Sequence, residues 1–492
     1  MSGNGTSSRA ALAVLAAAAI ALVAPHCAAA LTVERATVGN PVPSGFVGLS
    51  MEYRGLAAYA GANPRAVDPA FVQLIRDIAP NQRPVLRIGG DSTDWTWYPV
   101  AHTRRPPGIR YDLSPNWIGV TRTLARTLDA RLIMGLNLEA DSRTVAAAEA
   151  RAFVSGIGRS TIDALEIGNE PELYGSFSWY RTPSGQHVTG RPAGYGFPGF
   201  VRDFSSFARS LPEIALAGPS SGSSPFLAQL GTFLRDEPRV RLATLHEYPL
   251  KHCVRSTVVT IGQLLSDASS HGLADTVAPL VAVAHSHRVQ ARVDEMNAVT
   301  CGGTSGVSDT FASALWALDT LFEMARVGVD GVNIHTVPNT INELLGPSFT
   351  KDGWEVRVHP QYYGLIMFAQ AAPPGSELLR IAGTPAVGVK VWATRAPDGH
   401  IRVVLINKHL RRAEVLRLQV QSASGPASVE QLRAPSIQSK TGVTLGGQSF
   451  GPQTATGLLA GRPQVTLLAP SGNAYVVRVP GASATMLTLS AQ

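Results

Sequence analysis

The sequence of 492 residues is poor in cysteine, with three, and in charged side chains, which make up 16%. Beyond the first thirty residues no stretch of eighteen residues is continuously apolar, so we predict no membrane span there. It has no lysine-rich run and no interleaved aromatic stripe, which argues against a nucleic-acid-binding protein. At 45% hydrophobic, the chain can bury a large core and form more than one domain.

The first thirty residues have the features of a secretory signal peptide. Arg9 gives a charged start, residues 10–24 are apolar, and Ala28–Ala30 supply small residues for cleavage. We therefore expect an exported protein, periplasmic or extracellular. Cys253 and Cys301 then remain, and an even pair in an oxidising compartment favours a disulfide. The alternatives are two free thiols or a metal site that includes His252.

The net charge is +7 and the isoelectric point is near 9.5. This excess of positive charge would suit an anionic substrate, although exported proteins also carry scattered arginines that bind no acidic partner.

Eight short apolar segments alternate with longer amphipathic segments between residues 46 and 375. This alternation predicts a (β/α)8 TIM barrel as the catalytic domain. The expected strands are Val47–Glu52, Pro84–Gly90, Arg131–Leu138, Ile162–Glu170, Ile214–Ser220, Leu242–Tyr248, Ala291–Asn297 and Gly331–Thr336. The expected helices include Pro69–Ala79, Pro115–Leu128, Gly199–Ser210, Pro225–Arg235, Ser308–Val327 and Pro360–Gln370.

From residue 376 to residue 492 the pattern changes to short alternating strands separated by turn residues such as Pro397-Asp398-Gly399. This pattern predicts a C-terminal β-sandwich. Its expected strands are Val387–Thr394, Ile401–Asn407, Val415–Val420, Gln464–Leu468 and Tyr475–Val479. Residues 31–45 contain a strand, Leu31–Thr37, that no helix follows, so we expect this strand to join the sandwich.

Two carboxylates stand at the ends of predicted barrel strands. Glu170 closes the fourth strand and Glu295 the seventh, and strands three apart face each other across the mouth of an eight-strand ring. Glycoside hydrolysis needs two such groups, one as proton donor and one as nucleophile or base. Either glutamate alone would be a solvated strand-end residue. The matched pair predicts a glycoside hydrolase.

The neighbouring residues suggest a role for each carboxyl. Pro171 makes the turn after Glu170 rigid, and the amide of Asn169 could bind a sugar hydroxyl. We expect Glu295 to be the ionised nucleophile and Glu170 to be protonated at rest, favoured by the negative charge of Glu295. A retaining mechanism requires the carboxyl groups to be about 5–5.5 Å apart and needs no cofactor.

Several motifs carry a resemblance to a known family. They are Ile167–Tyr174, the segment Glu295–Gly303 followed by Ser308–Phe311, Leu86–Asp91 and His246–Pro249. In this order they resemble glycoside hydrolase family 79, the β-glucuronidases and heparanases, over the barrel and into the β-sandwich.

The resemblance implies Glu170 as acid/base and Glu295 as nucleophile. It also implies that the loop after Glu295 binds the substrate carboxylate, through the amides of Gly302 and Gly303 and a hydroxyl at Thr300. Residues without side chains let amides approach an anion closely. Thr300 stands where mammalian heparanases have tyrosine, and the next residue, Cys301, where they have glycine. The alternative is a plain flexible turn.

The resemblance suggests a role for the expected disulfide. Cys253 follows the sixth predicted strand and Cys301 the seventh, so their loops should be neighbours. A bond between the two cysteines would pin the loop that binds the carboxylate.

Other contacts are expected around the mouth of the barrel. The resemblance implies that Tyr248 supports the nucleophile by a hydrogen bond; otherwise it is a rim aromatic. His335 and Asn342 follow or end the eighth strand and are candidates for the rim. His285 and His287 are too close in sequence to share a helix face, so we expect no metal site there.

Glu52 and Asp91 end the first and second strands. They could bind sugar hydroxyls, or they could be structural partners of Arg87 or Arg54.

These observations predict a secreted retaining exo-β-glucuronidase. Its expected partner is a glucuronic-acid-containing glycan or an aryl glucuronide, and we expect a monomer that binds no nucleic acid. A close alternative is an endo-acting, heparanase-like enzyme with a basic rim. Arg104, Arg105 and Arg110 could form that rim or be solvated surface. A third is a non-catalytic glycan-binding protein, which would have no need for both glutamates.

Overall fold

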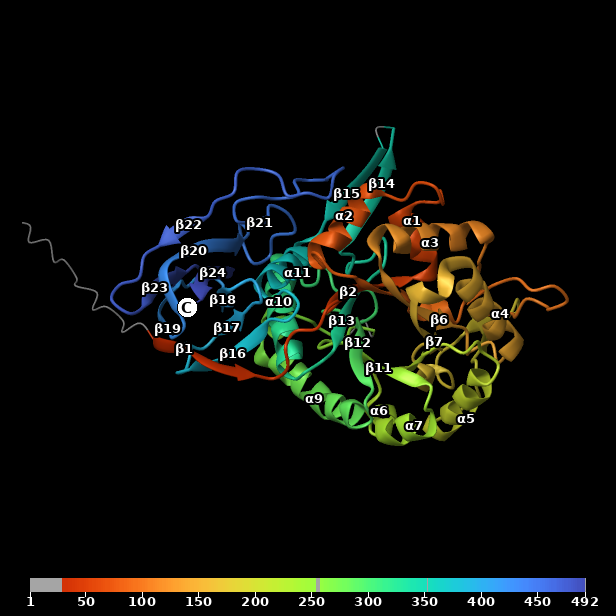
Figure 1. Ribbon diagram of the computed structural model, residues 1–492. Coiled ribbons are helices and arrows are strands. Elements are labelled where there is room, and N and C mark those ends of the chain that lie inside the picture. Colours follow the sequence, from red (N-terminus) through yellow and green to blue (C-terminus); the bar gives the residue numbers. More distant parts are fainter. Residues whose placement is uncertain (1–28, 254–256, 352, 492) are drawn as a thin grey trace, which may run out of the picture.

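The computed structural model describes residues 29–253, 257–351 and 353–491. The predicted signal peptide lies outside the described residues except for its last two, which begin strand β1. Figure 1 shows two parts side by side, a barrel surrounded by helices and a β domain that carries the C-terminus. No helix in the described ranges is long and apolar enough to cross a membrane.

The first part is a closed barrel of eight parallel strands, as the sequence predicts. Going round the ring, the order is β10, β11, β12, β13, β2, β3, β6 and β7. The bounds are β2 Val47–Glu52, β3 Val85–Gly89, β6 Arg131–Leu136, β7 Ile162–Ile167, β10 Leu216–Ser221, β11 Val240–Glu247, β12 Gln290–Met296 and β13 Gly331–Thr336. Most residues of these strands are buried, because side chains fill the barrel on one face and helices cover the other.

Helices surround the barrel in Figure 1. Their bounds are α1 Leu56–Ala60, α2 Pro69–Ile78, α3 Pro115–Leu128, α4 Arg143–Phe153, α5 Phe197–Ala208, α6 Ser224–Leu227, α7 Leu230–Asp236, α8 Ile261–Leu264, α9 His271–Ser286, α10 Phe311–Arg326 and α11 Pro360–Ala371. Local sequence starts several of them. At α3, for example, the Ser114 side chain accepts a hydrogen bond from the amide of Trp117, and Pro115 occupies the first turn.

Some predicted boundaries are wrong for identifiable reasons. The fourth barrel strand ends at Ile167 instead of Glu170, because Gly168 and Glu170 both adopt positive φ angles that no strand permits. The predicted helix Pro225–Arg235 is two short helices, α6 and α7. The sequence analysis also missed the hairpin of β14 (Leu345–Thr350) and β15 (Gly353–Val358), which projects from the barrel in Figure 1.

The second part is a ten-stranded mixed sheet with its own apolar core, and most of its strand pairs are antiparallel. Strand β1 (Ala29–Val38) pairs with β16 and β19, so the N-terminal strand joins this domain as the sequence predicts. The other bounds are β16 Glu377–Ala382, β17 Val389–Arg395, β18 His400–Asn407, β19 Glu414–Val420, β20 Ala423–Arg433, β21 Thr444–Leu445, β22 Thr466–Leu468, β23 Tyr475–Val479 and β24 Ser483–Ala491. Strands β16, β20, β21 and β24 are additional to the predicted strands.

The β domain is fastened to the barrel through helix α10. Asp319 on this helix is fully buried and binds Lys408 of the β domain at 2.7 Å. Trp392 Nε1 donates to the other oxygen of Asp319 at 2.9 Å, and its ring stacks on Phe322. Since these contacts are both polar and apolar, the β domain braces the barrel as a fixed part of the molecule.

Candidate active site

Glu170 and Glu295 meet at the mouth of the barrel. Glu170 lies three residues beyond the end of β7, and Glu295 is the penultimate residue of β12. One carboxylate oxygen of each lies within 4.8 Å of the other. The two strands stand three places apart in the ring, which is the arrangement that the sequence predicts for them.

The backbone holds Glu170 in an unusual conformation. Its φ of 45° and ψ of 55° are left-handed, a region that a residue with a long side chain seldom occupies. Two hydrogen bonds and the following proline hold it there. The Glu170 amide donates to Ser220 O at 2.8 Å, the Leu173 amide donates to Glu170 O at 2.9 Å, and Pro171 follows directly. The carboxyl group is thereby aimed over the barrel by a rigid turn.

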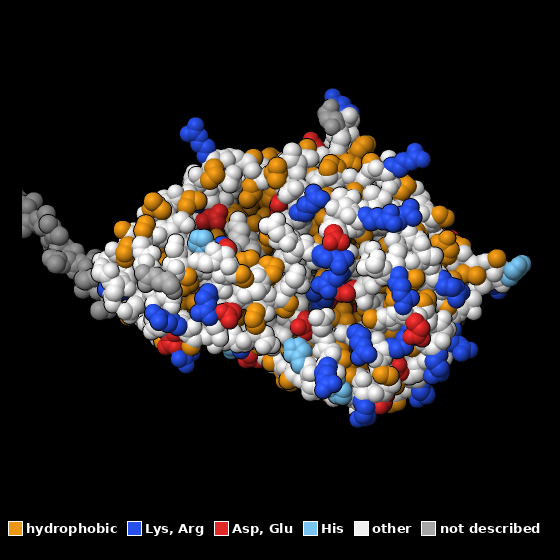
Figure 2. Space-filling model, in the orientation of Figure 1, with side chains coloured by type: hydrophobic (Ala, Val, Ile, Leu, Met, Phe, Trp, Pro, Cys, Tyr) orange, Lys and Arg blue, Asp and Glu red, His pale blue; other side chains and the backbone are white. Residues whose placement is uncertain are grey.

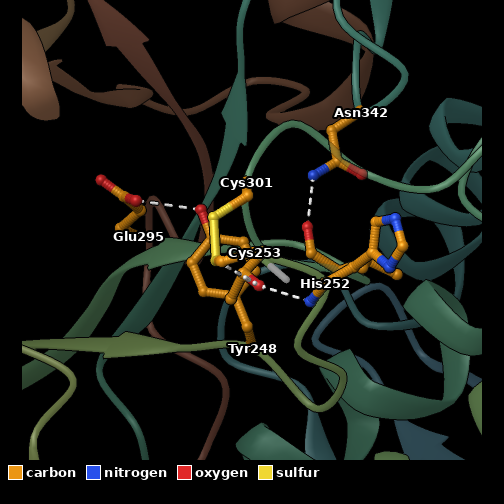
Figure 3. The surroundings of a disulfide bond; sticks show 8 residues. Tyr248, His252, Cys253, Glu295, Cys301 and Asn342 are labelled. Atoms are coloured by element: carbon orange, nitrogen blue, oxygen red, sulfur yellow. Dashed lines mark hydrogen bonds between the residues drawn. A yellow bond between two sulfur atoms is a disulfide. The ribbon is translucent and has the colours of Figure 1, made fainter. Parts of the chain in front are cut away.

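Both oxygens of Glu295 accept a hydrogen bond. Arg87 Nη1 donates to Oε2 at 2.6 Å, and Tyr248 OH donates to Oε1 at 2.9 Å. Figure 3 shows the second contact. Burial opposes ionisation of this carboxyl, but the nearby positive charges outweigh burial and hold the pKa of Glu295 well below its usual range. These charges come from His335, His246 and Arg87.

Arg87 is the hub of the site. It lies on β3 and is fully buried, and its guanidinium also donates from Nε to Glu166 at 2.7 Å and from Nη2 to Asn169 at 2.8 Å. Asp294 lies 3.0 Å from Nε. The alternative that Glu52 or Asp91 pairs with Arg87 or Arg54 is wrong, since neither forms such an ion pair among the described residues. The only sequence feature that could have indicated this network was Arg87 itself, a charged residue inside an otherwise apolar strand. A buried arginine requires acidic partners.

A β-bulge explains how consecutive residues can both reach Arg87. In the pairing of β11 with β12, Leu245 lies opposite Val293, and the next residue, His246, lies opposite Glu295. The pairing thus advances by one residue along β11 but by two along β12. Asp294 is therefore the extra residue. Side chains normally point alternately to the two faces of a strand. The bulge interrupts this alternation, so that Asp294 and Glu295 both contact the guanidinium of Arg87.

His246 connects the two catalytic candidates. Its Nδ1 lies 3.0 Å from Glu170 Oε1, and the ring is buried. Burial alone would lower the pKa of His246, but the charge of Glu295 and the hydrogen bond to Glu170 outweigh burial and raise it to about 10. The ring thus donates to Glu170 Oε1, and the other oxygen of that carboxyl has no hydrogen-bond partner among the described residues. Sequence analysis quoted His246 only within a motif and assigned it no role.

Three further predicted residues surround the pair. Asn169 Oδ1 accepts from Arg87, so its amide nitrogen is the part left to bind a ligand. Glu52 is buried and accepts from the amide of Ser92 at 2.8 Å. Asp91 is exposed to solvent at the mouth of the barrel, beside the carboxylates of Glu52, Glu170 and Glu295. Contacts of these residues with a sugar remain predictions.

His335, on β13, lies between Glu52 and Glu295. Its Nε2 lies 3.6 Å from Glu52, and its Nδ1 lies 3.7 Å from Glu295 and 3.1 Å from the hydroxyl of Ser50. Burial lowers the pKa of His335, but the charge of Glu295 and the contacts with Glu52 outweigh burial and raise it.

The predicted disulfide is present. Cys253 and Cys301 are bonded, with their Cα atoms 5.3 Å apart, and Figure 3 places the bond beside Tyr248. Cys301 has a φ of 54°, a left-handed angle that glycine adopts without cost. This explains why glycine can stand at this position in heparanases. Here the disulfide holds a residue with a side chain in the same turn.

Some polar groups of the loop that was expected to bind the substrate carboxylate form hydrogen bonds within the protein. The Gly303 amide donates to Thr300 O at 3.2 Å. The Thr300 hydroxyl oxygen accepts from the amide of His252 at 3.0 Å. The amide of Gly302 has no hydrogen-bond acceptor among the described residues. Substrate contacts through Gly302, Gly303 or the Thr300 hydroxyl remain predictions.

Asn342 supports this loop from behind. It is buried, its backbone amide donates to Gly302 O at 3.0 Å, and its Nδ2 donates to Val299 O at 2.6 Å. Figure 3 shows the second contact. A side chain on Gly303 would meet the Asn342 amide at 2.4 Å, so only glycine fits there. The structure thus gives Asn342 a clamping position instead of one on the open rim.

The arginines that were predicted to form a basic rim differ in their contacts. Arg105 pairs with Asp112 at 2.9 Å, so it is a surface ion pair. Arg110 lies 3.9 Å over the ring of Trp95, and Arg54 lies 5.8 Å from the same ring. Neither Arg54 nor Arg110 forms an ion pair with any described carboxylate. Trp95 also lines a cavity of about 110 Å³ that reaches Glu170.

One motif outside the predicted set required examination. Gly218-Pro219-Ser220-Ser221-Gly222 has the Gly-x-Ser-x-Gly spacing of a nucleophile elbow, and the sequence analysis passed over it. Ser220 Oγ lies 3.1 Å from His246 Nε2, as a serine nucleophile would. However, Ser220 is fully buried, and Arg87 donates to its Oγ at 3.1 Å. It is therefore part of the support beneath the site and does not reach a substrate.

Glu170, His246 and Glu295 are also the one group of described residues whose donor atoms lie close enough to hold a metal ion. Arg87 already places a fixed positive charge 2.6 Å from Glu295. A cation added there would meet repulsion, so the donor set fits acid–base chemistry better than metal binding.

Comparisons with known proteins agree with this architecture. Residues 391–486 match the description "Glycosyl hydrolase family 79 C-terminal beta domain". A protein named "Beta-glucuronidase" from Neurospora crassa is 22% identical over 426 residues, which cover 77% of this chain and 74% of that protein.

Solved structures share the fold at low identity. A 4-O-α-L-rhamnosyl-β-D-glucuronidase from Fusarium oxysporum matches with a TM-score of 0.74 and 21% identity, over 93% of this chain and 100% of that chain. A GH51 arabinofuranosidase from Xanthomonas axonopodis pv. citri matches with a TM-score of 0.65 and 16% identity, over 94% and 100%. Since the C-terminal domain carries the family's own sequence pattern and the relative by sequence spans both domains, the chain belongs to glycoside hydrolase family 79.

Proposed function

We propose that the protein is a retaining exo-β-glucuronidase, with Glu295 as nucleophile and Glu170 as acid/base. The observation that carries this proposal is the spacing of the two carboxyls, whose nearest oxygens lie within 4.8 Å. Retaining glycosidases hold these groups about 5–5.5 Å apart, whereas inverting enzymes need about 6.5–9.5 Å to admit a water molecule.

In the first step Glu295 attacks the anomeric carbon while Glu170 protonates the departing glycosidic oxygen. Arg87 and Tyr248 keep Glu295 ionised and aimed, since each donates to one of its oxygens. His246 occupies Glu170 Oε1, so the proton is carried on Oε2 toward the leaving group. The bond between the anomeric carbon and the leaving oxygen breaks, and a glycosyl ester on Glu295 forms.

In the second step Glu170 acts as the base. Having given up its proton, it takes one from a water molecule, which attacks the anomeric carbon and releases Glu295. The imidazole of His246 stabilises the ionised form of Glu170 at this stage, because it donates to that carboxylate. The product keeps the configuration of the substrate.

Glucuronic acid is the sugar that several observations favour. The relatives in Neurospora and Fusarium are named as glucuronidases. The loop at Thr300 and Gly302 offers a hydroxyl and an unpaired amide beside Glu295, and such groups suit an anion. The net charge of +7 favours an acidic substrate as well.

Exo action is favoured by the small size of the space beside Glu170. The cavity of about 110 Å³ is walled by the aromatic residues Trp95, Phe177 and Trp179. On the face shown in Figure 2, Lys and Arg side chains are spread over the barrel, several with acidic neighbours, and form no continuous track for a polymer. The second candidate, endo action, is favoured by one observation. Arg54 and Arg110 lie around Trp95, and neither pairs with a described carboxylate.

A purely glycan-binding role has less support. A β domain that binds sugars would present exposed aromatics for stacking. No aromatic side chain between residues 376 and 491 is among the large hydrophobic residues exposed in the described chain, and Trp392 faces the barrel. We also propose export, because the bonded Cys253–Cys301 pair suits an oxidising compartment.

The test is turnover of p-nitrophenyl β-glucuronide against the matching β-glucoside. We expect activity on the glucuronide alone, and its loss in Glu295→Ala. With a poorer leaving group, Glu170→Gln should lower kcat/KM by about 10²–10⁴-fold, because the general acid is removed. Glu213→Gln, which changes an exposed carboxylate far from the site, is the matched control. Unchanged turnover in Glu295→Ala would refute the assignment.

A further inference from the structure

Two carboxyl groups share the Nε atom of Arg87 beneath the nucleophile. Glu166 Oε2 lies 2.7 Å and Asp294 Oδ2 lies 3.0 Å from this nitrogen. Both side chains are fully buried, and so is Arg87. With Glu295 on Nη1, three carboxyls surround one guanidinium in the buried interior of the barrel.

The oxygens of this pair lack hydrogen-bond donors. Oε1 of Glu166 and both oxygens of Asp294 are buried without a hydrogen-bond partner among the described residues. Ionised carboxylates only accept hydrogen bonds, so two of them in contact leave every such oxygen unsatisfied. A proton on one carboxyl turns it into a donor for the other and removes the deficit.

No other neighbour supplies the missing donor. His246 Nε2 lies 3.8 Å from Asp294, beyond hydrogen-bond distance. Arg292 directs its guanidinium to Asn333 and to the carbonyl of Gly45 instead. The remaining titratable group that faces the pair, the hydroxyl of Tyr53, donates to Gly135 O.

We propose that Glu166 and Asp294 hold one proton between them and act as positioning residues that set the charge around Arg87. This proposal rests on the proposed function, in which Arg87 orients the nucleophile. The pair then carries a single negative charge, which balances Arg87 and leaves its Nη1 to donate to Glu295. With both carboxyls neutral, Arg87 would hold Glu295 more tightly and weaken it as a nucleophile.

The titration of the pair agrees with its geometry. Burial and the charge of Glu166 raise the pKa of Asp294 well above its usual range. Burial opposes ionisation of Glu166 too, but Arg87 outweighs it and lowers the pKa of Glu166. The proton therefore resides on Asp294.

A double-mutant cycle tests the proposal. In Asp294→Asn or Glu166→Gln alone, the remaining carboxylate keeps the total charge at minus one, so the acidic limb of the pH profile of kcat/KM should stay near that of the wild type. The double variant has no charge left in the pair. Its acidic limb should move to lower pH, and its kcat should fall about ten-fold or more beyond the product of the single effects. Single variants that each move the limb, with multiplicative effects, would overturn the proposal.

An infrared spectrum gives a second readout that needs no turnover. The difference between the wild type and Asp294→Asn at neutral pH should contain the carbonyl stretch of a protonated carboxylic acid, and the difference with Glu166→Gln should contain it as well. Absence of this band would overturn the proposal even if Glu295 is the nucleophile. Presence of the band without glucuronidase activity would refute only the proposed function. Glu149→Gln, which changes another buried carboxyl, is the control that should leave the pH profile unchanged.

Discussion

At the scale of single residues, the site depends on one buried positive charge. Arg87 donates to Glu295, Glu166 and Asn169, and its side chain is fully buried. Replacing it by methionine keeps the volume of the side chain but leaves buried carboxylates uncompensated. We expect Arg87→Met to lower the free energy of unfolding by about 3–5 kcal/mol and to abolish turnover.

Urea denaturation at neutral pH measures the change in stability. Arg104→Met is the control, because Arg104 is exposed and forms no ion pair with any residue that the structure describes. The stability of this variant should stay close to that of the wild type. A stable Arg87→Met protein with normal turnover would contradict the role assigned to this residue.

His246 makes the stability of the protein depend on pH. Its pKa is about 10 in the folded protein and about 6.5 in an unfolded chain, so between these values only the folded state keeps the proton. The free energy of unfolding contributed by this group is fully present below the lower value and is lost as the pH rises toward 10.

The measurement is urea denaturation of the wild type and of His246→Gln across this range. The advantage of the wild type should shrink as the pH rises. If the difference between the two proteins were constant with pH, His246 would not be protonated in the folded state.

At the scale of elements, the disulfide ties together the loops after β11 and β12. Cys253 and Cys301 are 48 residues apart, so their bond restricts a long loop of the unfolded chain. We expect the double variant Cys253→Ser/Cys301→Ser to lose about 2–4 kcal/mol of stability. The KM for a glucuronide should rise more than kcat falls, since the loop at Thr300 would lose its anchor.

Reduction of the wild type by a thiol provides the matched control, because it breaks the same bond without any substitution. Its kinetics should equal those of the double variant. If KM stayed unchanged in both proteins, this loop would not hold the substrate.

Sequence reasoning reached the elements of the barrel but not the details of β12. The strands could be predicted because apolar segments of strand length alternate with amphipathic helices, and β2 and β13 have the predicted bounds. Asp294 was not predicted, since strict alternation would place it on the face opposite Glu295. The bulge that brings both to Arg87 arises from pairing with β11, a tertiary effect without a local sequence signal.

The β domain was harder to predict. Strand β20 contains Gly425 and Pro426, and β24 is rich in alanine, serine and threonine, so neither shows a clear alternation of apolar and polar residues. Pairing with neighbouring strands stabilises both, and β24 lies between β18 and β20. By contrast, β1 was predicted to join this domain because no helix follows it.

At the scale of the whole molecule, the β domain and the barrel should unfold together. Lys408 and Asp319 form a buried ion pair between them, so Lys408→Met leaves a buried carboxylate without its partner. We expect a loss of about 3–5 kcal/mol in a single cooperative transition, measured by calorimetry and urea denaturation. Lys440→Met is the control. Its ion pair with Asp309 is half exposed and should contribute less than about 1 kcal/mol. Two separate transitions in the wild type would contradict the bracing role.

The central claim is that Glu295 forms a covalent bond with a glucuronyl group. The most direct test is to treat the protein with a 2-fluoro-β-glucuronyl fluoride, which slows hydrolysis of the covalent intermediate, and to map the labelled peptide by mass spectrometry. If Glu295 is the nucleophile, one glucuronyl label will be found, located on Glu295, and none will form from the matching glucosyl reagent. A label on another residue, or steady turnover of a glucuronide without any trapped label, would contradict it.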